Sequence, residues 1–125
     1  MRYDEFIDAV SDRIGVPVGE AESLTYATLT TLAERITGGE ARDLASQLPR
    51  PLRDLLLPSP EPAERFDLDE FIRRVSDRAG VGAAEATAGM RAVFATLRKA
   101  VTGGEFDEIM TQLPAEFREA VGTGV

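Results

Sequence analysis

Apolar residues recur at three- and four-residue steps in two short stretches of the chain, one at its start and one beyond residue 66. The positions are Tyr3, Phe6, Ile7, Val10 and Ile14 in the first stretch, and Leu68, Phe71, Ile72 and Val75 in the second. This spacing places the apolar side chains on one face of a helix. Gly15 and Gly80 follow the two stretches, and glycine readily takes the left-handed conformation that ends a helix. The pattern predicts two amphipathic helices with glycine caps.

Three further helices are predicted after each of these. A long helix over about residues 19–37 and a short one after residue 40 continue the apolar periodicity. Proline disfavours helix in the preceding residue and suits a first helical turn, so a fourth helix should begin at Pro49 and at Pro114. The expected core positions are Leu24, Leu29, Leu32, Ile36, Ala41, Leu44, Ala45, Leu48, Leu52, Leu55 and Leu56, then Met90, Val93, Phe94, Leu97, Val101, Phe106, Ile109, Met110, Leu113, Phe117 and Val121.

The chain repeats itself without a gap at a spacing of 65 residues. The shared landmarks are Phe6 and Phe71, Gly15 and Gly80, Gly38 and Gly103, Leu48 and Leu113, and Arg53 and Arg118. We interpret residues 1–56 as the first copy, 57–65 as a proline-rich linker and 66–125 as the second copy. Four short helices bury too little surface to be stable alone. The prediction is one all-α domain of about eight helices with approximate two-fold symmetry between the copies.

Each copy also contains the sequence TGGE, at 37–40 and at 102–105. We interpret Gly38 and Gly103 as the residues that close the long helix, and the second glycine of each pair as a turn residue. Glu40 and Glu105 then place a negative charge near the positive N-terminus of the next helix. A phosphate-binding loop would need a longer glycine-rich turn with Lys and Ser or Thr, which is missing here.

These landmarks resemble those of the bacterial domain of unknown function 2267 family. The resemblance spans essentially the whole chain and rests on Phe6, Val10, Gly15, Gly38, Gly39, Glu40, Gln47, Leu48 and Pro49, and on the same landmarks 65 residues later. The linker departs from the family pattern, because an aromatic residue such as Trp is expected where LLLPSPEPAERF stands. The resemblance implies an all-helical cytoplasmic bacterial protein, and it implies no activity, cofactor or catalytic residue.

Composition excludes several kinds of chemistry. The chain has no Cys and no His, so disulfides, zinc sites built on thiolate or imidazole, cysteine nucleophiles and histidine-based triads are ruled out. A net charge of −8 and the absence of any Lys/Arg run disfavour nucleic-acid binding. No apolar stretch is long enough to predict a membrane span, and the N-terminus lacks the apolar run of a signal peptide. We therefore expect a soluble cytoplasmic protein without a cofactor.

The repeated sequence SDR is the main candidate for a functional surface. It comprises Ser11, Asp12 and Arg13 in the first copy and Ser76, Asp77 and Arg78 in the second. Both aspartates point away from the apolar stripe, near a helix C-terminus where a negative charge is unfavourable. Three interpretations compete: ion pairs of Asp12 with Arg53 and of Asp77 with Arg118, a doubled recognition surface for a partner, or a metal site.

The metal interpretation requires several oxygens converging on one point. The acids of the first helix, Asp4, Glu5, Asp8 and Asp12, spread around it instead, and Asp8 is replaced by Arg73 in the second copy. We therefore predict no metal site and no catalytic residue.

The sequence thus favours a noncatalytic helical module that binds an unknown protein partner or a second copy of itself. The alternatives are a carboxylate-based divalent-metal-binding protein or hydrolase, and a protein that holds a small apolar ligand between its two copies. Tyr26, whose place is taken by Arg91 in the second copy, is an additional candidate for a partner contact.

Overall fold

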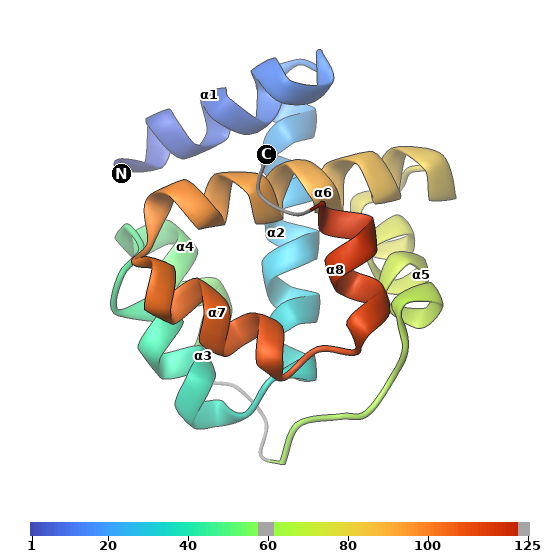
Figure 1. Cartoon of the computed structure of the whole chain (residues 1–125). Coiled ribbons are helices and arrows are strands. Elements are labelled where there is room, and N and C mark those ends of the chain that lie inside the picture. Colours follow the sequence, from blue (N-terminus) through green and yellow to red (C-terminus); the bar gives the residue numbers. More distant parts are fainter. Residues whose placement is uncertain (58–61, 123–125) are drawn as a thin grey trace.

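The computed structural model describes residues 1–57 and 62–122, and this part of the chain is built from helices alone (Figure 1). The eight helices are α1 (Tyr3–Ile14), α2 (Val18–Arg35), α3 (Gly38–Ala45), α4 (Arg50–Leu56), α5 (Leu68–Ala79), α6 (Ala83–Ala100), α7 (Gly103–Thr111) and α8 (Ala115–Val121). The predicted all-α class and number of helices are confirmed. Part of the predicted linker, 58–61, lies outside the described residues.

Helices α5 to α8 begin where α1 to α4 begin, 65 residues further on. The packing is also repeated: α1 lies against α2 and α6, and α5 lies against α6 and α2. Helices α2 and α6 cross at the centre, and α3 and α7 lie beside each other (Figure 1). At the level of whole helices, the contacts of α1 with α6 and of α5 with α2 are therefore counterparts of the kind that the predicted two-fold relation requires. The two-fold axis itself stays a prediction.

The glycine caps of the first helices are confirmed. Gly15 and Gly80 have φ angles of 65° and 70°, and their amides donate to the carbonyls of Ser11 and Ser76 at 2.8 and 2.9 Å. A side chain at either position would be strained, because the left-handed region is costly for residues with a Cβ. These caps turn the chain directly into the long helices.

The interpretation of Gly38 and Gly103 is wrong. These glycines are the first residues of α3 and α7, and neither has a positive φ. The preceding long helices end at Arg35 and Ala100, and the next residue, Ile36 or Val101, is extended. The extended backbone redirects the chain, so no left-handed residue is needed at the end of α2 or α6.

The core runs continuously through both copies. The expected core positions are all buried except Leu55 and Val121, which are half-buried. Phe71 packs edge-on against Phe94 and Phe117, with ring centroids 6.1 and 5.3 Å apart. Where α2 crosses α6, Leu24 packs directly over Gly89, and a Cβ on Gly89 would lie 2.7 Å from a methyl carbon of Leu24. The close crossing of the two long helices therefore depends on a residue without a side chain.

The short final helices of each copy begin one residue later than predicted, because Pro49 and Pro114 lie just before them as N-caps. The glutamines before these prolines connect the copies. The side-chain carbonyl of Gln47 accepts from the Thr102 amide at 2.8 Å, and that of Gln112 accepts from the Thr37 amide at 2.9 Å. Within the described residues, no helix is long and apolar enough to cross a membrane.

Candidate functional site

The repeated SDR sequence has largely structural partners. The hydroxyls of Ser11 and Ser76 donate to the carbonyls of Val16 and Val81, closing the turn after each first helix. Arg78 holds both carboxylate oxygens of Glu34 at 2.8 and 2.9 Å, and it also donates to Thr31. These bonds fix α5 to α2.

The two SDR copies are not chemically equivalent. The position that matches Glu34 in the second copy is Lys99, so Arg13 faces a different environment from Arg78. Asp12, Arg13 and Asp77 are exposed. A role for these three residues in recognition stays a prediction.

The two aspartate–arginine pairs expected from the sequence, Asp12 with Arg53 and Asp77 with Arg118, are not among the ion pairs of residues 1–57 and 62–122. Asp77 pairs with Arg73 on its own helix at 3.0 Å. Arg53 donates to the carbonyls of Ala45 and Leu48, both at 3.2 Å. Arg53 therefore bonds the last carbonyl of α3 and the Leu48 carbonyl in the turn that follows, and ties α4 to both.

Tyr26, the other predicted contact residue, is 38% exposed and its hydroxyl lies in hydrogen-bond contact with that of Tyr3. Tyr3 in turn donates to the carboxylate of Glu22. The ring of Tyr26 thus helps to attach α1 to α2.

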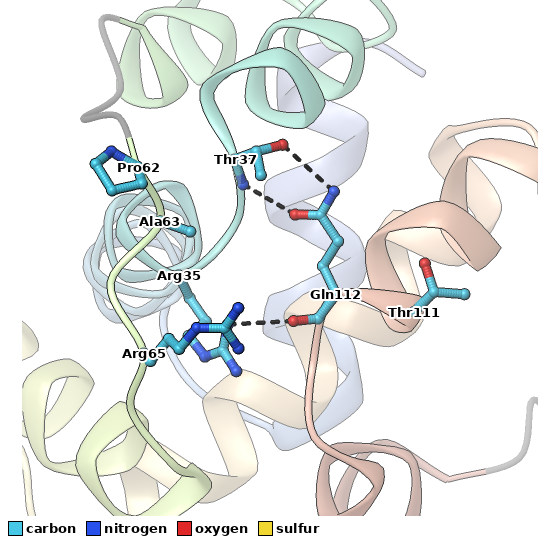
Figure 2. A pocket seen from close by; sticks show the side chains of 7 residues that line it. All are labelled: Arg35, Thr37, Pro62, Ala63, Arg65, Thr111 and Gln112. Atoms are coloured by element: carbon cyan, nitrogen blue, oxygen red, sulfur yellow. Dashed lines mark hydrogen bonds between the residues drawn. The ribbon is translucent and has the colours of Figure 1, made fainter.

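A cavity lies between the C-terminus of α2, the last part of the linker and the C-terminus of α7. Its volume is about 520 Å³. Figure 2 shows the seven lining residues, which we call the arginine pocket: Arg35, Thr37, Pro62, Ala63, Arg65, Thr111 and Gln112. Helix and linker residues from both copies meet here, because the Glu64 amide donates to the carbonyl of Glu34 at 2.9 Å and holds the linker along α2.

Arg35 is the buried cation of the arginine pocket. Only 9% of its surface is exposed, and its guanidinium donates to the carbonyls of Phe66 at 2.8 Å and Gln112 at 3.1 Å. Burial and the nearby positive charge of Arg65 lower the pKa of Arg35. Both causes disfavour the charged form, so an anion between the two guanidiniums would be favourable.

Gln112 lines one side of the pocket and is held in place by hydrogen bonds. Its side-chain carbonyl accepts from the Thr37 amide, and its side-chain NH₂ donates to the Thr37 hydroxyl at 3.3 Å (Figure 2). Its backbone carbonyl holds Arg35. One residue of α7's C-terminus therefore positions both the cation and the hydroxyl on the opposite wall.

Among residues 1–57 and 62–122, the lining contains two arginines and no acid. Guanidinium groups bind carboxylate and phosphate through paired hydrogen bonds. The pocket therefore suits an oxyanion better than the small apolar ligand that was one alternative from the sequence. The repeated residues do not indicate this pocket, because the counterpart of Arg35 in the second copy is Ala100. The difference between the two copies at this position was the feature of the sequence that could have indicated the pocket.

A group of acids lies at the contact of α3 with α7. Oxygens of Glu40, Asp43 and Glu105 all lie within 4.8 Å of one another. Burial, followed by the close approach of the Glu40 carboxylate, raises the pKa of Glu105 to about 8. The acids of α1 that we weighed as metal ligands are occupied differently: Asp4 pairs with Arg2 at 2.8 Å, and Glu5 accepts from the Arg2 amide.

Comparison with known proteins places the chain in a family. A search of curated proteins finds no match. The model of one family, described as "Uncharacterized conserved protein (DUF2267)", matches residues 3–120. Because this match covers nearly the whole chain, the protein belongs to the DUF2267 family, as its repeated landmarks indicate.

Proposed function

We propose that this protein is a noncatalytic binding module that takes an oxyanion group of a protein partner into the arginine pocket. The observation that carries the proposal is the buried guanidinium of Arg35, which lies beside Arg65 in a cavity with no acid among its described lining residues. A buried charge is costly unless it is paired. The two carbonyls that Arg35 bonds are neutral, so they supply hydrogen-bond acceptors and no compensating charge.

The geometry suits a group presented from outside. Arg35 lies deep in the pocket, whereas Arg65 and Pro62 are exposed at its rim. A carboxylate or phosphate on a partner's surface would meet Arg65 first and then reach Arg35. Because the whole chain carries a net charge of −8, a free anion is repelled at long range, and contacts around a presented group would offset that repulsion.

The lining also favours binding over turnover. In the part of the chain that the structure describes, it contains no Asp, Glu or Lys that could act as a general base. The hydroxyl of Thr37 accepts from Gln112 and from the Glu40 amide, and the hydroxyl of Thr111 donates to the Glu108 carbonyl. Both hydroxyls thus have structural bonds, and no described lining residue is a base that could activate them.

The test is a titration with three probes: inorganic phosphate, acetate, and an unrelated short peptide that ends in a free carboxylate. Nuclear magnetic resonance would follow the side-chain Nε–H signals of Arg35 and Arg65. We expect a saturable shift of Arg35, and tighter binding of the peptide than of acetate. No saturable shift with any probe would contradict the proposal, and binding of free phosphate alone would replace the protein partner with a small anion.

Two variants locate the site. Arg65→Ala removes an exposed cation that bonds no buried group within residues 1–57 and 62–122, so the fold should survive while binding weakens about tenfold, the loss expected for a charged hydrogen bond. Arg50→Ala is the matched control, because Arg50 is also exposed but lies outside the pocket lining. Equal binding by the two variants would show that the arginine pocket is not the site.

A further inference from the structure

The contact between α3 and α7 brings the same residue of each copy together. Glu40 and Glu105 occupy equivalent positions in the two TGGE sequences, and their carboxylates face each other. Each also has a second acid three residues later, Asp43 in α3 and Glu108 in α7. Residues three apart share one helix face. The two helices therefore present four acids toward one region, which we call the acidic cluster.

The glutamates face each other because another residue has taken their usual role. Thr-x-x-Glu at a helix N-terminus normally forms a capping box, in which the glutamate accepts from the threonine amide. Here the hydroxyls of Thr37 and Thr102 cap the amides of Glu40 and Glu105, both at 3.2 Å. The amides of Thr37 and Thr102, however, donate to glutamine side chains of the other copy. The glutamate carboxylates are thus released from capping.

Two oxygens in the cluster have no hydrogen-bond donor. Glu40 is only 8% exposed. Its Oε1 and the Oε2 of Glu105 are both buried and, within the part of the chain that the structure describes, have no partner. An unsatisfied buried acceptor destabilises the fold, and a charged one does so more strongly. This burial is an observation separate from the number of acids, and it calls for a positively charged partner between the two oxygens.

We propose that Glu40, Asp43 and Glu105 bind a hard divalent cation that links the two copies of the repeat. Two oxygens on one Ca²⁺ ion lie at most roughly 5 Å apart, because each Ca–O distance is about 2.3–2.6 Å. The separations of up to 4.8 Å in the cluster are compatible with this limit. Hard cations such as Ca²⁺, Mg²⁺ and Mn²⁺ prefer carboxylate oxygens and water. Asp43 is exposed, so the ion can enter from solvent and keep water ligands.

An ion at this site would hold the two copies of the repeat together. Helix α3 belongs to the first copy and α7 to the second, so an ion bound by both resists their separation. A ligand that binds only the folded state raises its stability. The proposal is independent of the arginine pocket, because none of the three acids lines that cavity.

The experiment uses the full chain after removal of metals with a chelator. Ca²⁺, Mg²⁺ and Mn²⁺ chlorides are titrated separately by calorimetry, and the unfolding temperature is measured with and without each ion. We expect one ion to bind per chain and to raise the unfolding temperature. Absence of both saturable heat and thermal shift with all three ions would overturn the proposal.

Glu105→Gln removes one proposed ligand and should weaken ion binding at least about tenfold. Glutamine keeps the shape of the side chain and can donate to the unsatisfied oxygen of Glu40, so the metal-free variant should unfold at no lower temperature than the wild type. Unfolding of the variant is thus excluded as the cause of lost binding. Asp107→Asn is the matched control, an exposed acid of α7 outside the cluster, and it should bind as the wild type does. Equal affinity of the two variants would also refute the site.

Discussion

Glu70 is the most strongly held carboxylate on the surface of α5. Arg73 donates to both of its oxygens, at 2.8 and 2.6 Å, and Arg74 donates to one at 2.8 Å. Arg74 also reaches Glu34 of α2 and Glu64 of the linker, and it lies over the ring of Phe66. These arginines, Arg73 first and Arg74 second, lower the pKa of Glu70 from 4.5 to about 2.

This shift predicts a loss of stability in acid. The unfolded chain takes up a proton at Glu70 near pH 4.5, whereas the folded chain does so only near pH 2. Where the unfolded state binds more protons, stability rises with pH. The contribution of Glu70 is therefore complete above pH 4.5 and is lost as the pH falls toward 2. Glu70→Gln should flatten this part of the stability curve, as measured by urea unfolding at a series of pH values.

Asp69→Asn is the control for this experiment, because Asp69 is an exposed acid next to Glu70 on the same helix. The wild-type slope should persist in this variant. If Glu70→Gln and Asp69→Asn have the same pH dependence, the arginines do not hold Glu70 as the structure indicates.

Single residues are also where sequence and structure diverge most. The repeated SDR sequence drew attention to exposed residues, yet Ser11, Ser76 and Arg78 have local structural bonds. The acidic cluster was within reach of the sequence: Glu40 and Glu105 are repeated, and identical positions can meet at an axis between copies. That they do meet depends on how α3 and α7 pack, which apolar periodicity does not determine.

Helices α2 and α6 cross so closely that there is no room for a side chain at Gly89. Leu24 of α2 is fully buried, and three of its side-chain carbons would lie 2.7 to 3.0 Å from a Cβ on Gly89. Core side chains are packed closely enough that added atoms force a shift. The two positions are also equivalents in the repeat, so the crossing pairs one large and one absent side chain.

Gly89→Ala should lower the free energy of unfolding by about 1–3 kcal/mol through overpacking against Leu24. In the Leu24→Ala background, the same change should be neutral or stabilising, because the clash is gone and alanine favours a helix by about 1 kcal/mol over glycine. Urea unfolding of the wild type, both single variants and the double variant gives the coupling energy.

Gly19→Ala, at a position in α2 with no atom within 4 Å of an added Cβ, should show no such penalty. Additive effects of the Leu24 and Gly89 changes would mean that the two side chains do not limit how closely the helices approach.

Helix bounds were largely predictable, because they follow from local chemistry. Gly15 and Gly80 end helices through their own backbone freedom, and Pro49 and Pro114 precede helices through theirs. The TGGE turns were misread because glycine has two uses near a helix end. Here it begins a helix after an extended residue, and that extended backbone is set by the packing of the buried Ile36.

At the scale of the whole molecule, the core joins the two copies. The central pair of helices, α2 and α6, comes from different copies, and α1 and α5 each pack against both of them. Cutting the chain at the linker would expose buried faces on each side. We predict that the chain folds and unfolds as one domain rather than as two independent halves.

The tyrosines offer a direct measurement of this cooperativity. The chain has no Trp, and both of its tyrosines, Tyr3 and Tyr26, lie in the first copy. Tyrosine fluorescence thus follows the first copy, whereas helical circular dichroism follows both. In urea the two signals should change together, as they do in a two-state transition. A fluorescence change that precedes or follows the loss of helix would show that the copies unfold separately.

The contact of Leu24 with Gly89 also shows an advantage of having both copies in one chain. Two identical half-length chains that pair about an axis must bring like against like wherever a residue lies on that axis. Leucine would collide with leucine at this crossing, and glycine opposite glycine would leave a hole. Packing a large side chain over a residue that has none requires two halves with different residues at this position. One chain whose two halves differ in sequence can therefore fit more closely at this crossing than two identical halves could.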